Sequence, residues 1–312
     1  MPKISIIGAG KVGGTAAFLM AIKNLGDVVL IDSQEDLARG RALDIIHCSS
    51  IENFQHSVIG SNDYKDIAGS DVVVITAGAS RLGESRTQLL EHNLDVMKEV
   101  AQKVMANAPD AFIVVVTNPL DVLTWVVKMV TNLPSNRVVG MAGILDSSRM
   151  NYYSSLAAGT YPKQFSCMIV GNHGENMVNV MSQMNLDGTN VTDLIKNGTI
   201  TEEQIRDASL NTTKSGFTIY KLTKTSTMYA PASSITGLVD AYINNRKKVI
   251  PCSVYLEGEY GVDGLCIGVP VVIGSKGMEE IVQVSLSEEE RKAFDAGVQN
   301  VRTSVDSIKD RI

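Results

Sequence analysis

The strongest constraint on the fold is an alternation of short apolar runs with longer amphipathic stretches in the first half of the chain. Each run is rich in β-branched residues over about five positions, as in strands that are buried on both faces of a sheet. Helix-like segments lie between them, for example 13–25 and 86–107. The runs are ISIIGAG (4–10), VVLID (28–32), VVVITAG (72–78), FIVVVTN (112–118) and VVGMAG (138–143). This alternation predicts a doubly wound parallel sheet.

The second half of the chain follows a less regular pattern, which is typical of an α+β domain. The expected elements are a helix at 147–159, strands near 167–171 and 186–188, a polar helical region at 201–246, strands VIPCSVYL (249–256) and GVPVVIG (268–274), and a charged helix at 287–310. The length of 312 residues also favours two domains. We therefore expect an α/β protein with a Rossmann doubly wound parallel sheet over residues 1–143, followed by an α+β substrate or catalytic domain over residues 144–312.

Charge and composition argue against several classes of protein. The net charge is −6 and no block of basic residues is present, so we expect no nucleic-acid partner. The most apolar long window (111–130) contains four interrupting polar, charged or proline residues, so we expect no membrane span. The N-terminus lacks a secretory signal pattern, and the four cysteines are far apart without a C-x-x-C pair. The expectation is a cytoplasmic enzyme without a disulfide framework.

A glycine-rich turn follows the first apolar run. IGAGKVGG places Gly8, Gly10 and Gly13 in the pattern G-x-G-x-x-G, directly before an apolar helix. In such a turn the first glycine allows the bend, the second lets the backbone approach a pyrophosphate, and the third lets helix and strand pack closely. The second run ends in Asp32, 22 residues after Gly10, where a carboxylate can bind ribose hydroxyls and repel a 2′-phosphate. The spacing favours NAD over NADP.

Polar residues also follow the later apolar runs. TAGAS (76–80) and TNP (117–119) lie at the carboxyl ends of expected strands, where open α/β sheets hold ligands. ILDSSRM places Asp146 and Arg149 three residues apart near the start of a helix, and therefore on one face. The alternative at that position is an N-capping Asp beside an unrelated surface Arg.

A loop with two arginines follows the third run. The segment 76–93, TAGASRLGESRTQLLEHN, carries Arg81 and Arg86 between small residues and glycines. Arginine binds carboxylates bidentately, so this loop is a candidate for substrate binding. The alternative is a solvated loop before a helix that Ser85 caps.

One of only four histidines lies in the segment GNHGENM (171–177), after the apolar run CMIV (167–170). From these residues alone, His173 can be a structural histidine, a metal ligand or a proton carrier. The wider pattern of motifs distinguishes these roles.

Six segments occur in the order found in the lactate/malate dehydrogenase family, which the chain resembles along essentially its whole length. They are GAGKVG, AGASRLGESR, TNPLDV, GILDSSR, GNHGE and YAPASS. The chain looks most like the malate dehydrogenases that are built on the lactate-dehydrogenase pattern. Together the six motifs are specific, although each alone is not.

The resemblance implies a role for each matching polar residue. His173 would be the proton donor and acceptor, with Asp146 paired to its other ring nitrogen. Arg149 would bind the C1 carboxylate of the substrate, and Arg86 would polarise the reacting carbonyl. Asn118 would hydrogen-bond to the substrate and help to place the nicotinamide, and the peptide bond after it would be cis.

The resemblance also implies the reaction and the cofactor. A hydride would pass between NAD(H) and a 2-oxo or 2-hydroxy acid, His173 would exchange the proton, and loop closure would exclude water. The expected cofactor-binding residues are Gly8, Gly10, Lys11, Val12, Gly13, Asp32, Thr76, Ala77, Gly78, Asn93, Thr117 and Asn118.

The identity of the acid depends on the loop before Arg86. Malate and oxaloacetate carry a second carboxylate, and Arg81 is the extra cation that could bind it. The loop SRLGESR is one residue shorter than the malate-type pattern P-R-K-P-G-M-x-R, so either Arg81 or Ser80 occupies the discriminating position. GESR and Thr227 look more like the lactate enzymes, whereas YAPASS (229–234) looks more like the malate enzymes. We expect a malate dehydrogenase, with L-lactate dehydrogenase as the alternative.

Two further alternatives come from other classes. An NAD- and metal-dependent glycosidase of similar fold would need a Cys and a His on a divalent ion, but Cys167 lies within an apolar run and reads as core. A catalytically inactive NAD-binding protein would not need His173, Asp146 and Arg149 together. We expect no metal ion in the site.

Family members are dimers or tetramers, so the resemblance implies a homodimer or homotetramer. Helices such as 37–47 and 228–243 mix polar and apolar residues and could pack between subunits. The expected small-molecule partner is a 2-oxo or 2-hydroxy dicarboxylate of the tricarboxylic acid cycle.

Overall fold

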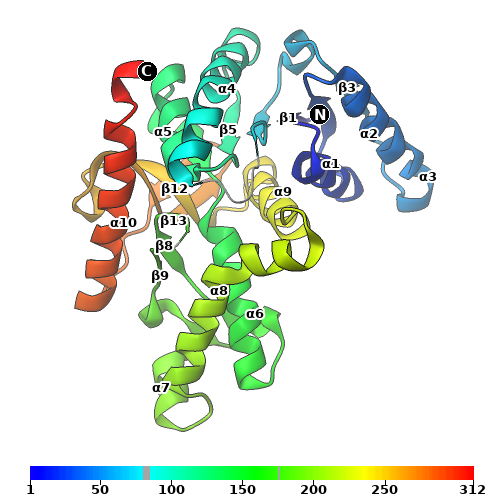
Figure 1. The fold of residues 1–312 in the computed structure, drawn as a ribbon. Coiled ribbons are helices and arrows are strands. Elements are labelled where there is room, and N and C mark those ends of the chain that lie inside the picture. The colour runs from blue at the N-terminus through cyan, green and yellow to red at the C-terminus, as the bar shows by residue number, and fades with distance from the viewer. Residues whose placement is uncertain (80–84, 175) are drawn as a thin grey trace.

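One large mixed sheet forms the centre of the molecule (Figure 1). The computed structural model describes residues 1–79, 85–174 and 176–312, with Arg86 described in its backbone only. Within these residues the sheet has eleven strands in the order β3-β2-β1-β4-β5-β6-β12-β13-β8-β9, and β14 pairs with β13.

The first six strands are parallel and form a Rossmann sheet. They are β1 (Lys3–Ile7), β2 (Asp27–Ile31), β3 (Val58–Ser61), β4 (Val72–Ile75), β5 (Phe112–Val115) and β6 (Val138–Gly140). Their register is parallel throughout, and the order reverses between β1 and β4. That reversal is the switch point at which open α/β sheets hold a ligand beyond the carboxyl ends of the strands. The doubly wound parallel sheet predicted from the apolar runs is confirmed.

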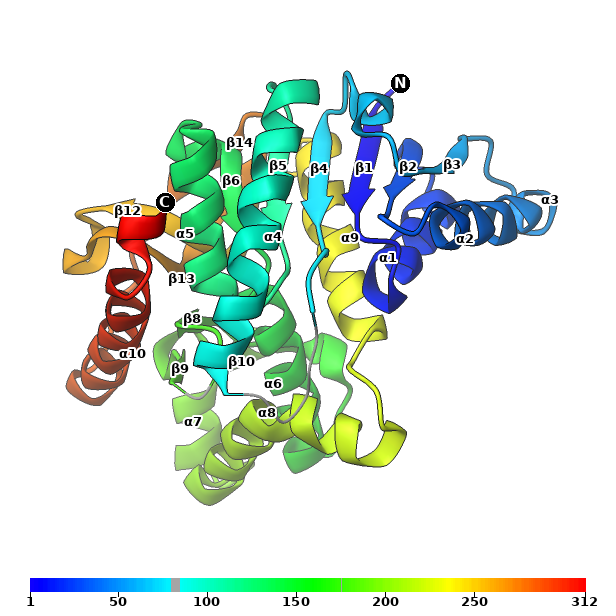
Figure 2. The same cartoon turned by 45° about the horizontal axis from the view of Figure 1, so that its top comes forward.

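Helices cover both faces of this sheet, as Figure 2 shows with α4 and α5 in front of it. Helix α9, which belongs to the second half of the chain, packs on α1. The helices of the first half are α1 (Lys11–Ile22), α2 (Glu35–His47), α3 (Ser49–Glu52), α4 (Arg86–Asn107) and α5 (Leu120–Thr131). Ser85 caps α4, a cap that the sequence offered only as part of the alternative for this loop: its hydroxyl accepts the Gln88 N–H, and the Gln88 side chain accepts the Ser85 N–H.

Antiparallel strands of the second half extend the same sheet. They are β12 (Lys248–Glu257), β13 (Asp263–Gly274), β8 (Ile169–Gly171), β9 (Met177–Asn179) and β14 (Gly277–Ile281). Strand β12 joins the parallel part where Ser253 pairs with Gly140 of β6. A separate small sheet contains β7 (Phe165–Ser166), β10 (Asn185–Leu186) and β11 (Thr189–Asn190).

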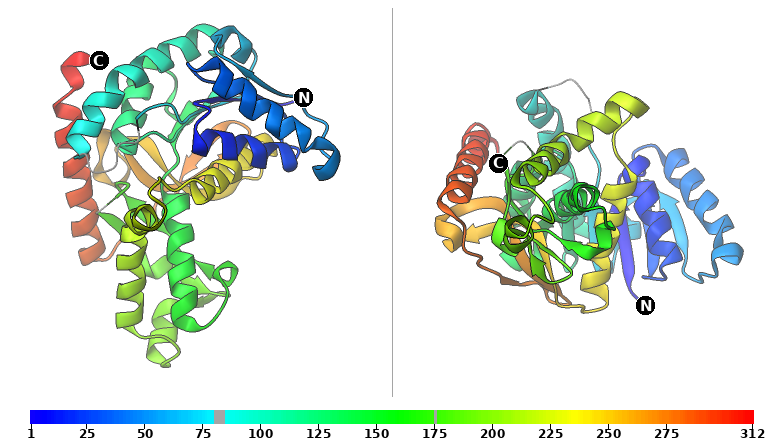
Figure 3. Two further views of the ribbon diagram at one scale, coloured as in Figure 1. Left: turned by 45° about the vertical axis from the view of Figure 1, so that its right-hand side comes forward. Right: turned by 90° about the horizontal axis from the view of Figure 1, so that it is seen from below.

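The helices of the second half are α6 (Gly143–Ala158), α7 (Val191–Lys196), α8 (Glu202–Thr223), α9 (Tyr229–Ile243) and α10 (Glu288–Asp306). They lie in two places: α6, α7 and α8 project from the sheet (Figure 3), whereas α9 packs on α1 and α10 packs on α5. Short 3-10 segments complete the chain: η1 (Tyr64–Ile67), η2 (Ser135–Arg137), η3 (Pro162–Gln164), η4 (Met181–Gln183), η5 (Glu259–Gly261) and η6 (Lys309–Arg311). None of the described helices is long and apolar enough to cross a membrane.

The structure corrects several expected boundaries. Strand β3 was not expected, and helix α1 begins at Lys11 rather than at residue 13. The expected helical region 201–246 is two helices, α8 and α9, separated by an irregular segment. Helix α6 begins at Gly143, four residues before the expected start. Residue 143 must be glycine, since a Cβ there would lie 2.6 Å from Pro251 Cβ and 2.8 Å from the Ile169 carbonyl oxygen.

The hydrophobic core is shared between the two halves of the sheet. Buried side chains of β1, β4 and β5 belong to one cluster with those of β12 and β13. A second cluster lies under α6 and α8 and includes Met150, Phe165 and Ile205. The division into domains at residue 143 stays a prediction, since the sheet itself continues across it.

Candidate active site

The glycine-rich turn joins β1 to α1 as the sequence predicts. Gly8 has a φ of +106°, a conformation that favours glycine. A Cβ on Gly13 would lie 1.9 Å from the Gly8 carbonyl oxygen, so α1 can approach the strand only because residue 13 is glycine. Gly10 is different, because no described atom lies within 4 Å of the position that its Cβ would take. The backbone at Gly10 is therefore open to a ligand at the N-terminus of α1.

Asp32 lies at the end of β2 and holds this turn in place. Its Oδ2 accepts the Ala9 N–H at 2.8 Å, and its Oδ1 accepts the Gln34 N–H at 3.0 Å. The open backbone at Gly10, the helix N-terminus and this carboxylate fit the pyrophosphate and ribose of a dinucleotide. These residues could hold NAD in the way that the sequence predicts.

The strand ends on the other side of the switch point are tied together by side chains. Thr76 Oγ1 donates to the Gly8 carbonyl oxygen at 2.9 Å, and Thr117 Oγ1 donates to the Ala77 carbonyl oxygen at 2.7 Å. Asn118 precedes a cis peptide bond to Pro119, as predicted.

Asn93, on α4, braces the loops that follow β4 and β5. Its side chain accepts the Ala79 N–H at 2.7 Å and donates to the carbonyl oxygens of Ala79 and Asn118. Asn93 is 1% exposed, and a Cβ on Gly78 would lie 2.9 Å from its Oδ1, so only glycine fits beside it. Direct contact of Asn93 with the cofactor stays a prediction.

A cleft of about 860 Å³ lies beyond these strand ends. Elements of both halves of the chain line it. Among the predicted residues, it is lined by Val12, Thr76, Gly78, Thr117, Asn118, Asp146, Arg149, His173 and Thr227.

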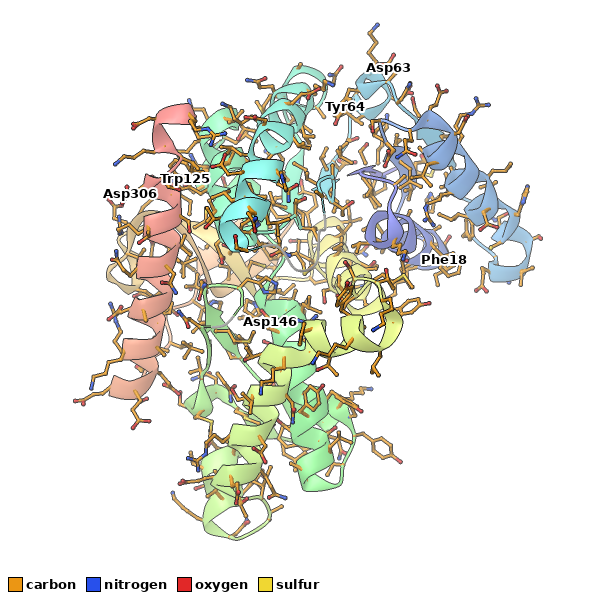
Figure 4. The ribbon with its side chains drawn as sticks, in the orientation of Figure 1. Phe18, Asp63, Tyr64, Trp125, Asp146 and Asp306 are labelled. Carbon is orange, nitrogen blue, oxygen red and sulfur yellow. The ribbon has the colours of Figure 1, made fainter. Side chains whose placement is uncertain are left out.

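Three of those residues form a contiguous charged group in the cleft. The His173 imidazole Nδ1 lies 2.7 Å from Asp146 Oδ2, and Arg149 Nη1 lies 3.4 Å from Asp146 Oδ1. The Asp146 side chain is only 2% exposed, while those of His173 and Arg149 are 16% and 14% exposed. Asp146 lies on the first turn of α6 in the middle of the molecule (Figure 4), and His173 follows β8.

The geometry fixes the state of the imidazole. A carboxylate can only accept a hydrogen bond, so Nδ1 of His173 carries the hydrogen and Nε2 is the nitrogen that exchanges a proton. Burial by itself lowers the pKa of His173, but the charge and hydrogen bond of Asp146 and the charge of Asp121 outweigh it, and the pKa is raised above the ordinary value of 6.5. Burial lowers the pKa of the Arg149 guanidinium, and the charge of Asp146 opposes this effect.

The alternative readings of these residues do not fit the geometry. The N-cap of α6 is Ala142, so Asp146 is not an N-capping residue. The thiol of Cys167 is buried, as predicted for core, and burial raises its pKa to about 12, which disfavours the thiolate that a metal ligand needs. Among the described residues no group of His, Cys, Asp and Glu side chains is arranged to hold a metal ion.

Three further residues were predicted to bind substrate or cofactor: Arg81, Arg86 and Lys11. Arg81 lies outside the described residues, and Arg86 begins α4 without a described side chain. Lys11 contacts the Thr225 hydroxyl and so connects the glycine turn to the segment that carries Thr227. Their expected contacts with substrate or cofactor stay predictions.

Sequence reasoning missed one residue of the site. Asp121, on the first turn of α5, is 4% exposed, lines the cleft, and accepts the backbone N–H of His173 at 2.8 Å. The sequence feature that could have indicated Asp121 is its position three residues after Asn118, at the start of a helix that follows a strand end.

A dinucleotide turn at the switch point, facing a histidine–carboxylate pair and a buried arginine, defines an NAD-dependent dehydrogenase of small acids. Family models agree: residues 2–140 match the lactate/malate dehydrogenase NAD binding domain, and residues 144–312 match the lactate/malate dehydrogenase alpha/beta C-terminal domain. The chain belongs to the lactate/malate dehydrogenase family. The predicted family, fold class and NAD cofactor are thereby confirmed.

Individual relatives cover nearly the whole chain. A malate dehydrogenase of Ehrlichia chaffeensis is 42% identical over 308 residues, which is 98% of each protein. The crystal structure of Cryptosporidium parvum malate dehydrogenase has a TM-score of 0.96 at 39% identity and covers 99% of each chain. A lactate dehydrogenase of the same organism, complexed with lactic acid and nicotinamide adenine dinucleotide, has a TM-score of 0.96 at 37% identity and covers 99% of this chain and 98% of its own.

Proposed function

We propose that this protein is an NAD-dependent malate dehydrogenase that interconverts (S)-malate and oxaloacetate. The observation that carries the proposal is the 2.7 Å contact of His173 with the buried Asp146 in the cleft that the glycine turn also borders. The 42% identical malate dehydrogenase supports the choice of substrate. Lactate dehydrogenase is the second candidate, because a lactate enzyme has the same fold at 37% identity.

His173 is the proton carrier in this proposal. The chemistry that NADH supplies when bound is hydride transfer to the carbonyl carbon of the 2-oxo acid. As negative charge grows on the carbonyl oxygen, protonated His173 donates from Nε2, while Asp146 keeps the ring oriented and stabilises the imidazolium. In malate oxidation neutral His173 accepts the proton from the hydroxyl group.

The cations of the site bind and orient the substrate. Arg149 is largely buried at the cleft, so its guanidinium can form a bidentate pair with the C1 carboxylate. By the family pattern, Arg86 polarises the carbonyl, Asn118 hydrogen-bonds to the substrate, and Arg81 binds the second carboxylate of the dicarboxylate. Because an unpaired carboxylate in a dry pocket is costly, the loss of Arg81 should change the choice of acid.

We also propose the domain boundary, the location and the assembly of the protein. The NAD-binding domain ends at residue 143 and the catalytic domain covers 144–312, in line with the two family matches. The protein works in the cytoplasm, in the tricarboxylic acid cycle, as a homodimer or homotetramer. Exposed Leu43 on α2 and Tyr229 on α9 support subunit contacts by these helices, and a single-chain mass in light scattering would contradict the assembly.

The experiment is a steady-state comparison of oxaloacetate and pyruvate with NADH for wild type and Arg81→Gln. We expect the wild type to prefer oxaloacetate strongly in kcat/KM, and Arg81→Gln to lose most of that preference while pyruvate turnover survives. Loss of one charge-assisted carboxylate contact typically costs about 1.5–3 kcal/mol, or roughly 10- to 150-fold.

The matched control is Arg39→Gln, which removes a cation from the exposed face of α2. Among the described residues, Arg39 forms an ion pair with Glu35 alone. This variant should keep the wild-type preference. A wild type that prefers pyruvate would identify a lactate dehydrogenase. A wild type and an Arg81→Gln variant that prefer oxaloacetate equally would remove Arg81 as the selector.

A further inference from the structure

We propose that Asp121 is a positioning residue for His173: it holds the backbone of the catalytic histidine from α5, while Asp146 holds the imidazole ring from α6. This inference rests on the proposed role of His173 as the proton carrier. It adds a second carboxylate that belongs to the Rossmann part of the fold.

Two hydrogen bonds hold His173, one at its backbone and one at its ring. Asp121 Oδ2 accepts the His173 backbone N–H at 2.8 Å, and Asp146 Oδ2 lies 2.7 Å from the ring Nδ1. One contact fixes the position of the residue, and the other fixes its side-chain orientation. With both in place, neither the main chain nor the ring can rotate without breaking a hydrogen bond to a buried carboxylate.

The location of Asp121 on α5 suits a carboxylate. It lies on the first turn of α5, where the unsatisfied N–H groups and the helix dipole favour negative charge. Its hydrogen bond joins α5 directly to the segment after β8, although 52 positions separate it from His173. The contact therefore fastens the histidine segment to the end of the parallel sheet that carries Asn118.

The described charged groups that act on the imidazole are two carboxylates and one guanidinium: Asp146, Asp121 and Arg149. Among these described groups, the two carboxylates balance the charges of protonated His173 and Arg149.

Helix α10 and strand β13 also pack against the segment that carries His173, and the residues that contact it there include glycines. A Cβ on Gly297 would lie 2.9 Å from Asn172 Oδ1, and one on Gly268 would lie 2.5 Å from the Gly171 carbonyl oxygen.

The consequence is that Asp121 affects the protonation of His173 as well as its position. The charge of Asp121 raises the pKa of His173, together with the larger effect of Asp146. Without that charge, the imidazolium should lose its proton at lower pH. The alkaline limit of oxaloacetate reduction and the acid limit of malate oxidation should both move to lower pH.

The decisive experiment is an NMR titration of ¹³C-labelled histidine in the full chain, for wild type and Asp121→Asn. Only four histidines are present, and His173→Gln assigns the relevant signal by its loss. Asparagine keeps an acceptor for the His173 N–H but removes the charge, so we expect the fold to be retained and the His173 midpoint to move to lower pH. The same variant should shift the pH profile of kcat/KM for oxaloacetate in the same direction.

The control is Asp63→Asn, which removes one carboxylate well away from Asp146 (Figure 4) and should leave the His173 midpoint unchanged. A second variant, Asp121→Ala, removes the acceptor too; it should lower kcat about 10- to 100-fold through misplacement, with the KM for NADH kept.

An unchanged His173 midpoint in folded Asp121→Asn would overturn the proposal, as would Asp121→Ala with wild-type kcat. The titration needs no substrate, so it remains informative if the enzyme proves to prefer pyruvate.

Discussion

Asp146 is the residue on which the chemistry of the site depends. It is nearly fully buried, and it contacts a cation on one side and a titratable ring on the other. Burial of an unpaired carboxylate is costly, and the two contacts offset that cost for Asp146. The same contacts give His173 its tautomer and Arg149 its orientation.

Asp146→Asn should therefore impair catalysis while the fold is kept. The amide can donate to Nδ1, which leaves Nε2 protonated in the neutral ring and unable to accept a proton from malate. We expect kcat for malate oxidation to fall by about 10²–10⁴, the usual loss for a general acid–base group. The alkaline limit of oxaloacetate reduction should also move to lower pH, because the anion that raises the pKa of His173 is lost.

Steady-state kinetics from acid to alkaline pH, with circular dichroism to verify folding, would measure both effects. Asp240→Asn is the matched control, since Asp240 also pairs with an arginine, Arg246, but on the surface of α9. Near-wild-type oxidation by folded Asp146→Asn would exclude the role given to this carboxylate.

At the scale of the residue, the sequence predicted which side chains carry the chemistry but not how they are connected. His173, Asp146 and Arg149 could be named because each lies in a recognisable motif. Asp121 could not, because its role depends on a hydrogen bond between segments 52 residues apart. Nothing in the local sequence specifies such a contact.

At the scale of the element, the turn between β1 and α1 shows two separate uses of glycine. Gly13 is required for packing, because its Cβ would meet the Gly8 carbonyl oxygen at 1.9 Å. Gly10 has no such neighbour, so its lack of a side chain matters only when a ligand approaches. These two uses can be separated by experiment.

Gly10→Ala should reduce NADH affinity without loss of stability. Gly10 has a φ of −66°, which alanine accepts, so the Cβ should interfere only with the bound pyrophosphate. We expect Kd for NADH to rise roughly 10-fold or more, which corresponds to about 1.4 kcal/mol, with Tm unchanged or slightly raised.

Gly40→Ala is the control in this case, because Gly40 lies within α2 and its Cβ would also meet open space. Because alanine has the higher helix propensity, this variant should gain about 0.5–1 kcal/mol in the free energy of unfolding and raise Tm a little. NADH binding should stay unchanged. Fluorescence titration of NADH and thermal melts distinguish the two variants. Equal NADH affinity for Gly10→Ala and wild type would place the pyrophosphate elsewhere.

Most elements could be predicted because parallel strands that are buried on both faces leave continuous β-branched runs in the sequence. Strand β3 was not predicted, because it is short and only its first residue, Val58, is buried. The start of α6 was not predicted, because Gly143 is a poor helix former and the N-cap residue of the helix makes no side-chain hydrogen bond. The close approach of Pro251 and Ile169 to Gly143 is tertiary, so the local sequence does not specify it.

At the scale of the whole molecule, the active site exists because one sheet continues through both halves of the chain. The parallel strands place the dinucleotide turn, and the antiparallel strands β12, β13 and β8 place His173 opposite it. The motifs indicated which residues take part, whereas the distances between them came only from the assembled sheet. We infer that His173, Asp146 and Arg149 converge on one substrate beside the bound nicotinamide.

A crystal structure of the complex with NADH and hydroxymalonate, an unreactive dicarboxylate, tests that claim most directly. We expect Nε2 of His173 to lie about 2.6–3.2 Å from the hydroxyl oxygen of the analogue, and Arg149 to pair with one of its carboxylates. A structure in which the analogue binds in the same cleft but the His173 ring faces away from its hydroxyl oxygen would contradict the account.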